Sequence, residues 1–130
     1  MVFTRGKKKE SIARAVTYEG NGIVRINKRS INALKPHYLC DIVREPLTLA
    51  SELSNKVNID VDVYGGGVMG QAEAVRIAIA RGLCAFSKSE ELKATMEKYD
   101  RYMICEDYRR VEPKKYKGPK ARARYQKSYR

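Results

Sequence analysis

Cysteine and histidine are scarce in this chain of 130 residues, which contains three cysteines and one histidine. Cys40, Cys84 and Cys105 are far apart, odd in number, and form no Cys-x-x-Cys pair. This pattern argues against a structural zinc site and against a disulfide framework, and it favours a reducing, intracellular setting. We therefore expect no metal site and no cofactor.

Long apolar segments are also missing. No apolar run approaches the roughly 20 residues that a membrane-spanning helix needs. The first ten residues, MVFTRGKKKE, are charged but are not followed by the apolar region of a signal peptide. Since 43% of the residues are nevertheless hydrophobic, the chain has enough apolar side chains for one small core.

Acidic residues almost disappear from the end of the chain. Ten of the 22 residues in 109–130 are Lys or Arg and only Glu112 opposes them, so this segment carries +9 of the net charge of +12. It has one large aliphatic residue, Val111, and two prolines and a glycine interrupt any helix or strand. We expect an extended basic tail that reaches roughly 70 Å at about 3.3 Å per residue.

A long polycation of this kind needs a polyanion as its partner. Tyr116, Tyr125 and Tyr129 lie among the cations, and tyrosine rings stack on exposed bases. A second basic cluster, Arg5 with Lys7, Lys8 and Lys9, precedes Arg14 near the start of the chain. The tail lacks an amphipathic face and a lipidation cysteine, so RNA is favoured over a membrane surface.

Local patterns predict the elements of the body. Residues 57–64 (VNIDVDVY) alternate between apolar and polar side chains, which is typical of a half-buried strand. Residues 12–19 and 23–27 flank Gly-Asn-Gly and are expected to pair as a hairpin. Residues 28–56 should be mostly helical, with Pro46 ending a helix, and 68–86 should form a longer helix.

Two further segments complete this description. Ser89 is the expected N-cap of a helix over 89–99, and a short strand or extended run is expected near 108–111. Whether Arg25, Arg76 and Arg81 touch RNA is left open by the sequence.

Residues Gly65 to Gly70 (GGGVMG) match the dinucleotide-binding pattern G-x-G-x-x-G between a strand and a helix. A dinucleotide-binding unit also needs a second parallel strand that ends in an acidic residue, and the sequence offers none. We expect these glycines to allow a sharp turn and a close approach to a neighbouring segment. A small nucleotide-binding enzyme domain that uses this loop is one alternative, and a basic RNA chaperone is another.

Four segments carry a more specific signal: GKKKESIARA, GNGIVRINKR, GGGVMGQAEAVRIAIARGL and VEPKKYKGPKARARYQKSYR. Together they resemble the ribosomal protein S9 family of the small subunit (the universal uS9 family), in its archaeal form, and this family is the alternative to a chaperone outside the ribosome. The resemblance covers nearly the whole chain. It implies an α+β body of the ribosomal S5 domain 2-like type, with a sheet, helices on one face, and the long basic C-terminal tail.

The resemblance also implies a structural, non-enzymatic role in the 30S subunit. The partners would be 16S-type rRNA in the subunit head, P-site tRNA and neighbouring head proteins, with no membrane and no small-molecule substrate, in the cytoplasm. The implied organisation is a basic extension (1–10), a globular rRNA-binding domain (11–108) and a tail (109–130) that reaches the P site.

Residues of three kinds are predicted to contact RNA. The expected rRNA contacts of the body are Arg5, Lys7, Lys8, Lys9 and Arg14. Those of the tail are Arg109, Arg110, Lys114, Lys115, Tyr116, Lys117, Lys120, Arg122, Arg124, Tyr125 and Lys127. The tip residues Ser128, Tyr129 and Arg130 are expected to meet the anticodon stem-loop of P-site tRNA.

Overall fold

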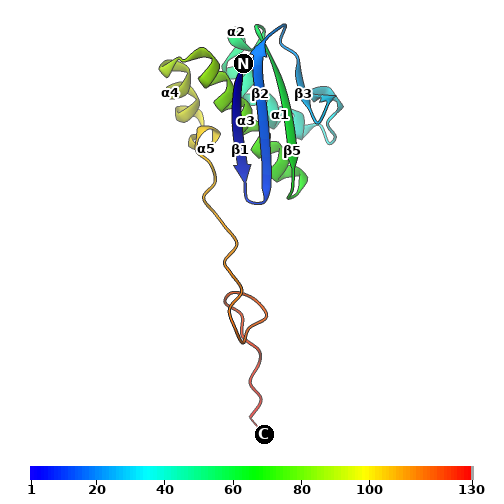
Figure 1. Cartoon of the computed structure of the whole chain (residues 1–130), viewed down its shortest axis with the longest axis vertical. Coiled ribbons are helices and arrows are strands. Elements are labelled where there is room, and N and C mark those ends of the chain that lie inside the picture. Colours follow the sequence, from blue (N-terminus) through cyan, green and yellow to red (C-terminus); the bar gives the residue numbers. More distant parts are fainter. Residues whose placement is uncertain (130) are drawn as a thin grey trace.

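A computed structural model describes residues 1–129, which form five strands and five α-helices followed by an irregular C-terminal segment (Figure 1). The strands are β1 (Val2–Lys8), β2 (Ser11–Glu19), β3 (Val24–Ile26), β4 (Arg29–Ser30) and β5 (Val57–Tyr64). The helices are α1 (Tyr38–Leu49), α2 (Ser51–Ser54), α3 (Val68–Ser87), α4 (Glu90–Tyr99) and α5 (Arg101–Ile104), with a 3-10 turn at Ile31–Ala33. The predicted α+β class is confirmed.

The five strands form one mixed sheet in the order β1-β2-β5-β3-β4. β1 and β2 are antiparallel neighbours joined by a tight turn, and β2 pairs antiparallel with β5 along its whole length. β3 runs parallel to β5 on the other side, with Val24 opposite Ile59 and Ile26 opposite Val61. β5 is therefore the central strand, which agrees with its buried, alternating side chains.

The hairpin predicted for residues 12–27 is wrong, because β5 lies between the two strands that were expected to pair. The Gly20-Asn21-Gly22 segment instead crosses the start of β5. Gly20 donates its backbone N–H to the carbonyl oxygen of Lys56 at 2.9 Å. The backbone N–H groups of Asn21 and Ile23 both donate to Oδ1 of Asn58 at 3.0 Å. A turn signal shows that the chain reverses, but it does not show which strand receives the returning segment.

Replacing Asn58 with alanine should destabilise the body by about 1–2 kcal/mol, because two backbone donors lose their shared acceptor. Asn58→Asp is the matched control, since it keeps an oxygen at the same position. Urea unfolding of both variants tests the expectation. Equal midpoints for the alanine variant and the parent chain would contradict the role assigned to Asn58.

Residues 1–10 were expected to form an extension outside the domain, but most of them belong to β1. β1 packs against α3, and Gly6 lies where the two backbones come closest. A Cβ atom at position 6 would clash with the carbonyl oxygen of Ala74 and lie 2.7 Å from the backbone nitrogen of Ala78. The glycine that seemed to interrupt a basic cluster is therefore a packing requirement.

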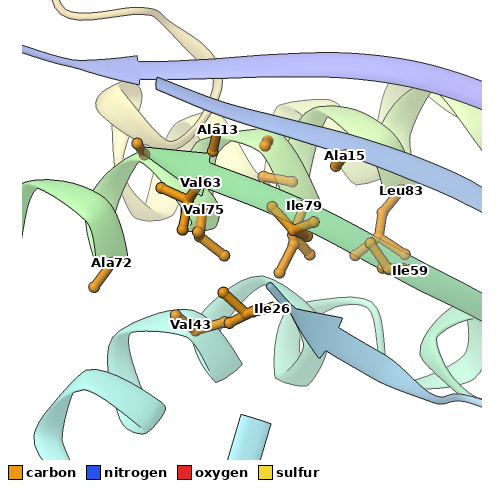
Figure 2. Packing of buried hydrophobic residues seen from close by; sticks show 14 of the residues in the cluster. Ala13, Ala15, Ile26, Val43, Ile59, Val63, Ala72, Val75, Ile79 and Leu83 are labelled. Atoms are coloured by element: carbon orange, nitrogen blue, oxygen red, sulfur yellow. The ribbon is translucent and has the colours of Figure 1, made fainter. Parts of the chain in front are cut away.

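The hydrophobic core lies between one face of the sheet and the helices α1 and α3 (Figure 2). From the sheet it receives Val57, Ile59, Val61 and Val63, as the alternating pattern predicted. From α3 it receives the predicted stripe, with Val75, Ile79 and Leu83 fully buried and Phe86 partly buried. Four alanines of α3, Ala72, Ala74, Ala78 and Ala80, are also buried, and their small side chains let the helix lie close to the sheet. Within residues 1–129, no helix is both long and apolar enough to cross a membrane.

Two helix boundaries test the sequence interpretation. Ser89 caps α4 as predicted, since its Oγ accepts a hydrogen bond from the backbone N–H of Leu92. Pro46 was expected to end a helix, but α1 continues through it to Leu49. Its ring is fully buried in the core, and this packing offsets the backbone hydrogen bond that proline cannot donate. The strand or extended run expected near 108–111 is irregular backbone.

Candidate nucleic-acid interface

The segment that follows α5 contains neither helix nor strand as far as Tyr129. Figure 1 shows it leaving the body beside α5 and running away from it. Tyr116, Tyr125 and Tyr129 are 87%, 65% and 89% exposed, so their rings are open to a partner. Arg130 lies outside the described residues, and its predicted contact with tRNA remains a prediction.

The tail contains a loop that its only acidic residue closes. Glu112 accepts hydrogen bonds from Nε of Arg122 at 2.9 Å and from Nη2 of the same guanidinium. These bonds from Arg122 lower the pKa of Glu112. Gly118 is buried inside the loop, where a Cβ atom would clash with the carbonyl oxygen of Ala123. The prediction of a fully extended tail is wrong between residues 112 and 122, because one carboxylate captures a guanidinium ten residues away.

Six cations of the tail have no carboxylate partner within residues 1–129, and all six are exposed. They are Lys114, Lys115, Lys117, Lys120, Arg124 and Lys127. Two of them contact the tail itself: Lys117 lies 5.8 Å from the ring centre of Tyr116, and Arg124 donates to the Tyr116 carbonyl oxygen at 3.5 Å. A concentration of uncompensated positive charge on an exposed segment without a core is a surface for a polyanion.

The predicted cations of the N-terminal cluster divide into two groups. Arg5 and Lys8 form ion pairs with the chain's own carboxylates, Arg5 with Glu106 at 3.0 Å and Lys8 with Glu73 on α3. Lys7 and Lys9 have no carboxylate partner within the described residues. Only the second pair is free to meet phosphate without first giving up a contact inside the protein.

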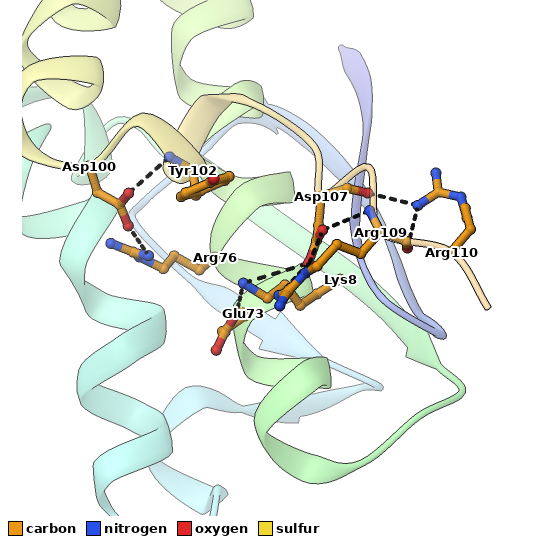
Figure 3. A network of polar contacts seen from close by, with 8 residues as sticks. All are labelled: Lys8, Glu73, Arg76, Asp100, Tyr102, Asp107, Arg109 and Arg110. Atoms are coloured by element: carbon orange, nitrogen blue, oxygen red, sulfur yellow. Dashed lines mark hydrogen bonds and ion pairs between the residues drawn. The ribbon is translucent and has the colours of Figure 1, made fainter. Parts of the chain in front are cut away.

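The base of the tail is held by a network of charged groups (Figure 3). Asp107, which is 3% exposed, accepts hydrogen bonds from the backbone N–H, Nε and Nη2 of Arg109. The Nζ of Lys8 on β1 approaches the same carboxylate at 3.9 Å. Arg110 donates to the Asp107 carbonyl oxygen at 2.7 Å. The two arginines predicted as the first rRNA contacts of the tail thus bind the chain's own carboxylate and carbonyl groups in this structure.

Arg76 and Arg81, whose role the sequence left open, connect parts of the body. Arg76 is 14% exposed and forms ion pairs with Glu45 of α1 and Asp100 between α4 and α5. Arg81 donates from Nε to the carbonyl oxygen of Ile104 and from Nη1 to that of Arg5, both at 2.8 Å. Both arginines are internal connectors between helices and strands.

The uncovered face of the sheet carries Arg14, a predicted rRNA contact, and Arg25, whose role the sequence left open. Arg14 lies 5.8 Å from the ring centre of Tyr64, and Arg25 lies 4.0 Å from a carboxylate oxygen of Asp60. Asp60 also accepts a hydrogen bond from the hydroxyl of Tyr18 at 2.9 Å, which raises the pKa of that tyrosine. The Asp60 carboxylate on this face is therefore bonded to neighbouring side chains.

The Gly65–Gly70 loop serves packing, as the sequence indicated. Gly65 and Gly66 have φ angles of 79° and 64°, in the left-handed region that favours glycine. A Cβ atom at Gly66 would clash with Oγ of Ser11, and one at Gly70 would lie 2.8 Å from it. Ser11 itself donates to the Gly65 carbonyl oxygen at 3.0 Å. The glycines bring the chain against the first residue of β2, and the enzyme alternative loses its supporting motif.

Comparison with known proteins agrees with this geometry. The family model described as ribosomal protein S9/S16 matches residues 6–130. The chain belongs to the ribosomal protein S9/S16 family. Relatives named small ribosomal subunit protein uS9 include one from Pyrobaculum aerophilum, 53% identical over all of this chain and 92% of the relative. Another, from Methanothrix thermoacetophila, is 45% identical over all of this chain and 98% of the relative.

Membership of the S9/S16 family gives the chain its general role. It is a structural constituent of the small ribosomal subunit and acts in the cytoplasm as part of a ribonucleoprotein. Its partners include rRNA and other ribosomal proteins. A relative from Halobacterium salinarum, 47% identical over 98% of this chain and 97% of its own length, extends the likeness to a third archaeon.

Sequence reasoning found the cations of the interface but missed the acids that divide them. Glu106 and Asp107 stand directly before the basic segment and bind Arg5, Lys8 and Arg109. The sequence signal for this division was the pair of acidic residues at the boundary between body and tail. It was missed because charged residues at such a boundary are usually interpreted as solvent-exposed. Their partners on β1 are about 100 residues away in the sequence, so only the fold brings them together.

Proposed function

We propose that the chain binds 16S-type rRNA in the head of the small subunit through its body and tail, and that the tip of the tail contacts P-site tRNA. The observation that carries this proposal is the exposed tail, with six unpaired cations and three exposed tyrosines on a segment that leaves the body. Such a segment binds by neutralising phosphates and stacking bases, and it becomes ordered in full only against its partner.

The residues share this work in four groups. Lys7 and Lys9, with Arg14 on the open face, supply phosphate contacts of the body. The unpaired tail cations, with Tyr116 and Tyr125, line the path through rRNA. Arg5, Lys8, Arg109, Arg110 and Arg122 reach phosphate in exchange for a contact within the chain. Ser128, Tyr129 and Arg130 form the tip. Neighbouring head proteins pack against the body, and the chain performs no catalysis.

A photoreactive residue at position 129 tests the assignment of the tip. We expect it to crosslink to the anticodon stem-loop of P-site tRNA in assembled subunits, because position 129 is at the end of the tail and 89% exposed. The same probe at Tyr116, which is equally exposed but lies in the tail loop, is the matched control and should crosslink to rRNA only. Crosslinks from position 129 to rRNA alone would remove the tRNA contact from the proposal.

A further inference from the structure

The tail is attached to the body over a short stretch. Residues 104–110 make several contacts with β1 and α3. Among the described residues, 111–129 form hydrogen bonds and ion pairs only within the tail. The direction in which the tail leaves the body is therefore determined within 104–110. We call this stretch, with the side chains that bind it, the tail root.

Asp107 is the centre of the tail root. Its carboxylate is almost fully buried, and it is bonded from two sides. Arg109 binds it from the tail, with distances of 2.9 Å from the backbone nitrogen, 3.1 Å from Nε and 2.8 Å from Nη2. Lys8 approaches it from the sheet. One carboxylate thus joins the first residues of the tail to β1.

Lys8 is itself fixed by the body. Its Nζ pairs with Glu73 of α3 and lies 5.8 Å from the ring centre of Tyr102 in α5 (Figure 3). Because Lys8 belongs to β1 and contacts both Glu73 and Tyr102, its charge cannot move with the tail. Through Lys8, the Asp107 carboxylate is therefore held in a fixed position relative to β1, α3 and α5.

Further contacts hold the same stretch of backbone. Arg81 of α3 bonds the carbonyl oxygens of Ile104 and Arg5, which ties the end of α5 to β1. Glu106 pairs with Arg5 at 3.0 Å and with Arg110 at 3.8 Å. These groups are more exposed than Asp107, so they support the arrangement that the buried carboxylate sets.

We propose that Asp107 is a positioning residue, which fixes the direction in which the basic tail leaves the body. A tail aimed in advance searches less space for its binding path, which raises its effective concentration there. This inference deepens the proposed function and rests on it for its biological value. The fixed direction itself is a property of the free protein.

The carboxylate keeps its charge at neutral pH. Hydrogen bonds from Arg109 hold the pKa of Asp107 well below its usual range. A carboxyl group with a lowered pKa contributes stability above its unfolded value of about 3.9 and loses it only as the pH falls below that value. Ionised Asp107 is therefore the state present in the cell.

The test compares two aspartate-to-asparagine variants of the full chain by ¹⁵N relaxation. In the parent chain, the amides of Asp107, Tyr108 and Arg109 should be as rigid as the sheet, with order parameters near 0.85, while the tail beyond the loop is flexible. Asp107→Asn should lower these values below about 0.6, because the asparagine carries no charge for Arg109 and Lys8. Asp41→Asn is the control, since Asp41 is an exposed residue of α1 paired with Arg44 at 4.0 Å.

The outcomes are decisive in both directions. Mobile amides at 107–109 in the parent chain would overturn the proposal, and so would equal order parameters in the two variants. Where Asp107→Asn prevents folding, Arg109→Gln removes the guanidinium bonds to Asp107 from the exposed tail side and should loosen the root while the melting temperature of the body stays near that of the parent.

A second readout separates the inference from the proposed function. In reconstituted subunits, deletion of residues 128–130 is the reference, because it measures how much P-site tRNA affinity is lost without the tip. Asp107→Asn should reproduce a part of that loss and Asp41→Asn none. If the deletion has no effect, the tRNA contact fails while the relaxation experiment still decides the role of Asp107. If the deletion acts but Asp107→Asn does not, the positioning role fails.

Discussion

A chain that ends at Val111 should bind small-subunit rRNA with a much shallower salt dependence than the full chain. The end point matters, because Arg109 then stays on Asp107 and the tail root remains intact. All six unpaired tail cations are removed. Each phosphate neutralised contributes about 0.7–0.9 to the slope of log K against log salt, so the slope should fall by about 4–5.

The affinity difference should be large at low salt and small at high salt. Six phosphate contacts correspond to a loss of about a thousandfold between roughly 50 and 200 mM salt, which filter binding measures directly. The shortened chain should be spared this loss. An unchanged slope would show that the tail does not neutralise phosphates and would overturn the tail-based interface.

Two full-length variants separate charge from stacking. Replacing the six unpaired cations with glutamine should produce most of the decrease in slope that truncation causes, because the tail keeps its length but loses most of its charge. Replacing Tyr116, Tyr125 and Tyr129 with leucine should leave the slope unchanged. The leucine variant should nevertheless lose affinity, since a stacked base contributes about 1–3 kcal/mol.

Gly6→Ala should destabilise the body severely, by more than about 4 kcal/mol, which is a large share of the stability of a small domain. The added Cβ atom meets the Ala74 carbonyl oxygen and the Ala78 nitrogen, and both are backbone atoms of a buried helix. Neither can move without shifting α3 away from β1. Denaturant unfolding monitored by circular dichroism measures the effect.

The matched control is the same substitution at Gly67. No heavy atom outside the glycine and its neighbours lies within 4 Å of a Cβ built there, and its φ of −106° suits any residue. Because Gly67 is the N-cap of α3, where alanine is less favourable than glycine, Gly67→Ala should cost only about 0.5–1 kcal/mol. If the two variants unfold at the same denaturant concentration, β1 does not pack on α3 as described.

The elements that the sequence predicted well are those with a complete local signal. The strand over 57–64 and the helix from Val68 follow from periodicity within one segment, and Ser89 carries its own cap. The failures involve partners that are distant in the sequence. Asn58 receives the turn that was expected to close a hairpin, and the core receives the ring of Pro46.

The candidate site divides along the same line. Composition alone predicts that residues 109–130 are basic and bind a polyanion, because the net charge of a segment can be counted without knowing the fold. Which cations are free depends on carboxylates brought from elsewhere. Arg5 pairs with Glu106, which is 101 residues away in the sequence, and Arg122 pairs with Glu112, which is ten residues away. Ion pairing therefore divides the cations into paired and unpaired groups, and this division cannot be read from the sequence of the basic segment alone.

The strand order has a consequence for how the protein is made. β3 is synthesised long before β5, yet its parallel partners, from Ile59 to Val61, are the only neighbours on that side of the sheet among the described residues. At about 5–20 residues per second, β3 waits several seconds for them. Before β5 emerges, the chain can pair its strands only as the β1–β2 hairpin and the separate β3–β4 pair, among the described residues, with one edge of β2 open until β5 inserts. The sheet is thus completed from its middle, once the single strand β5 has emerged.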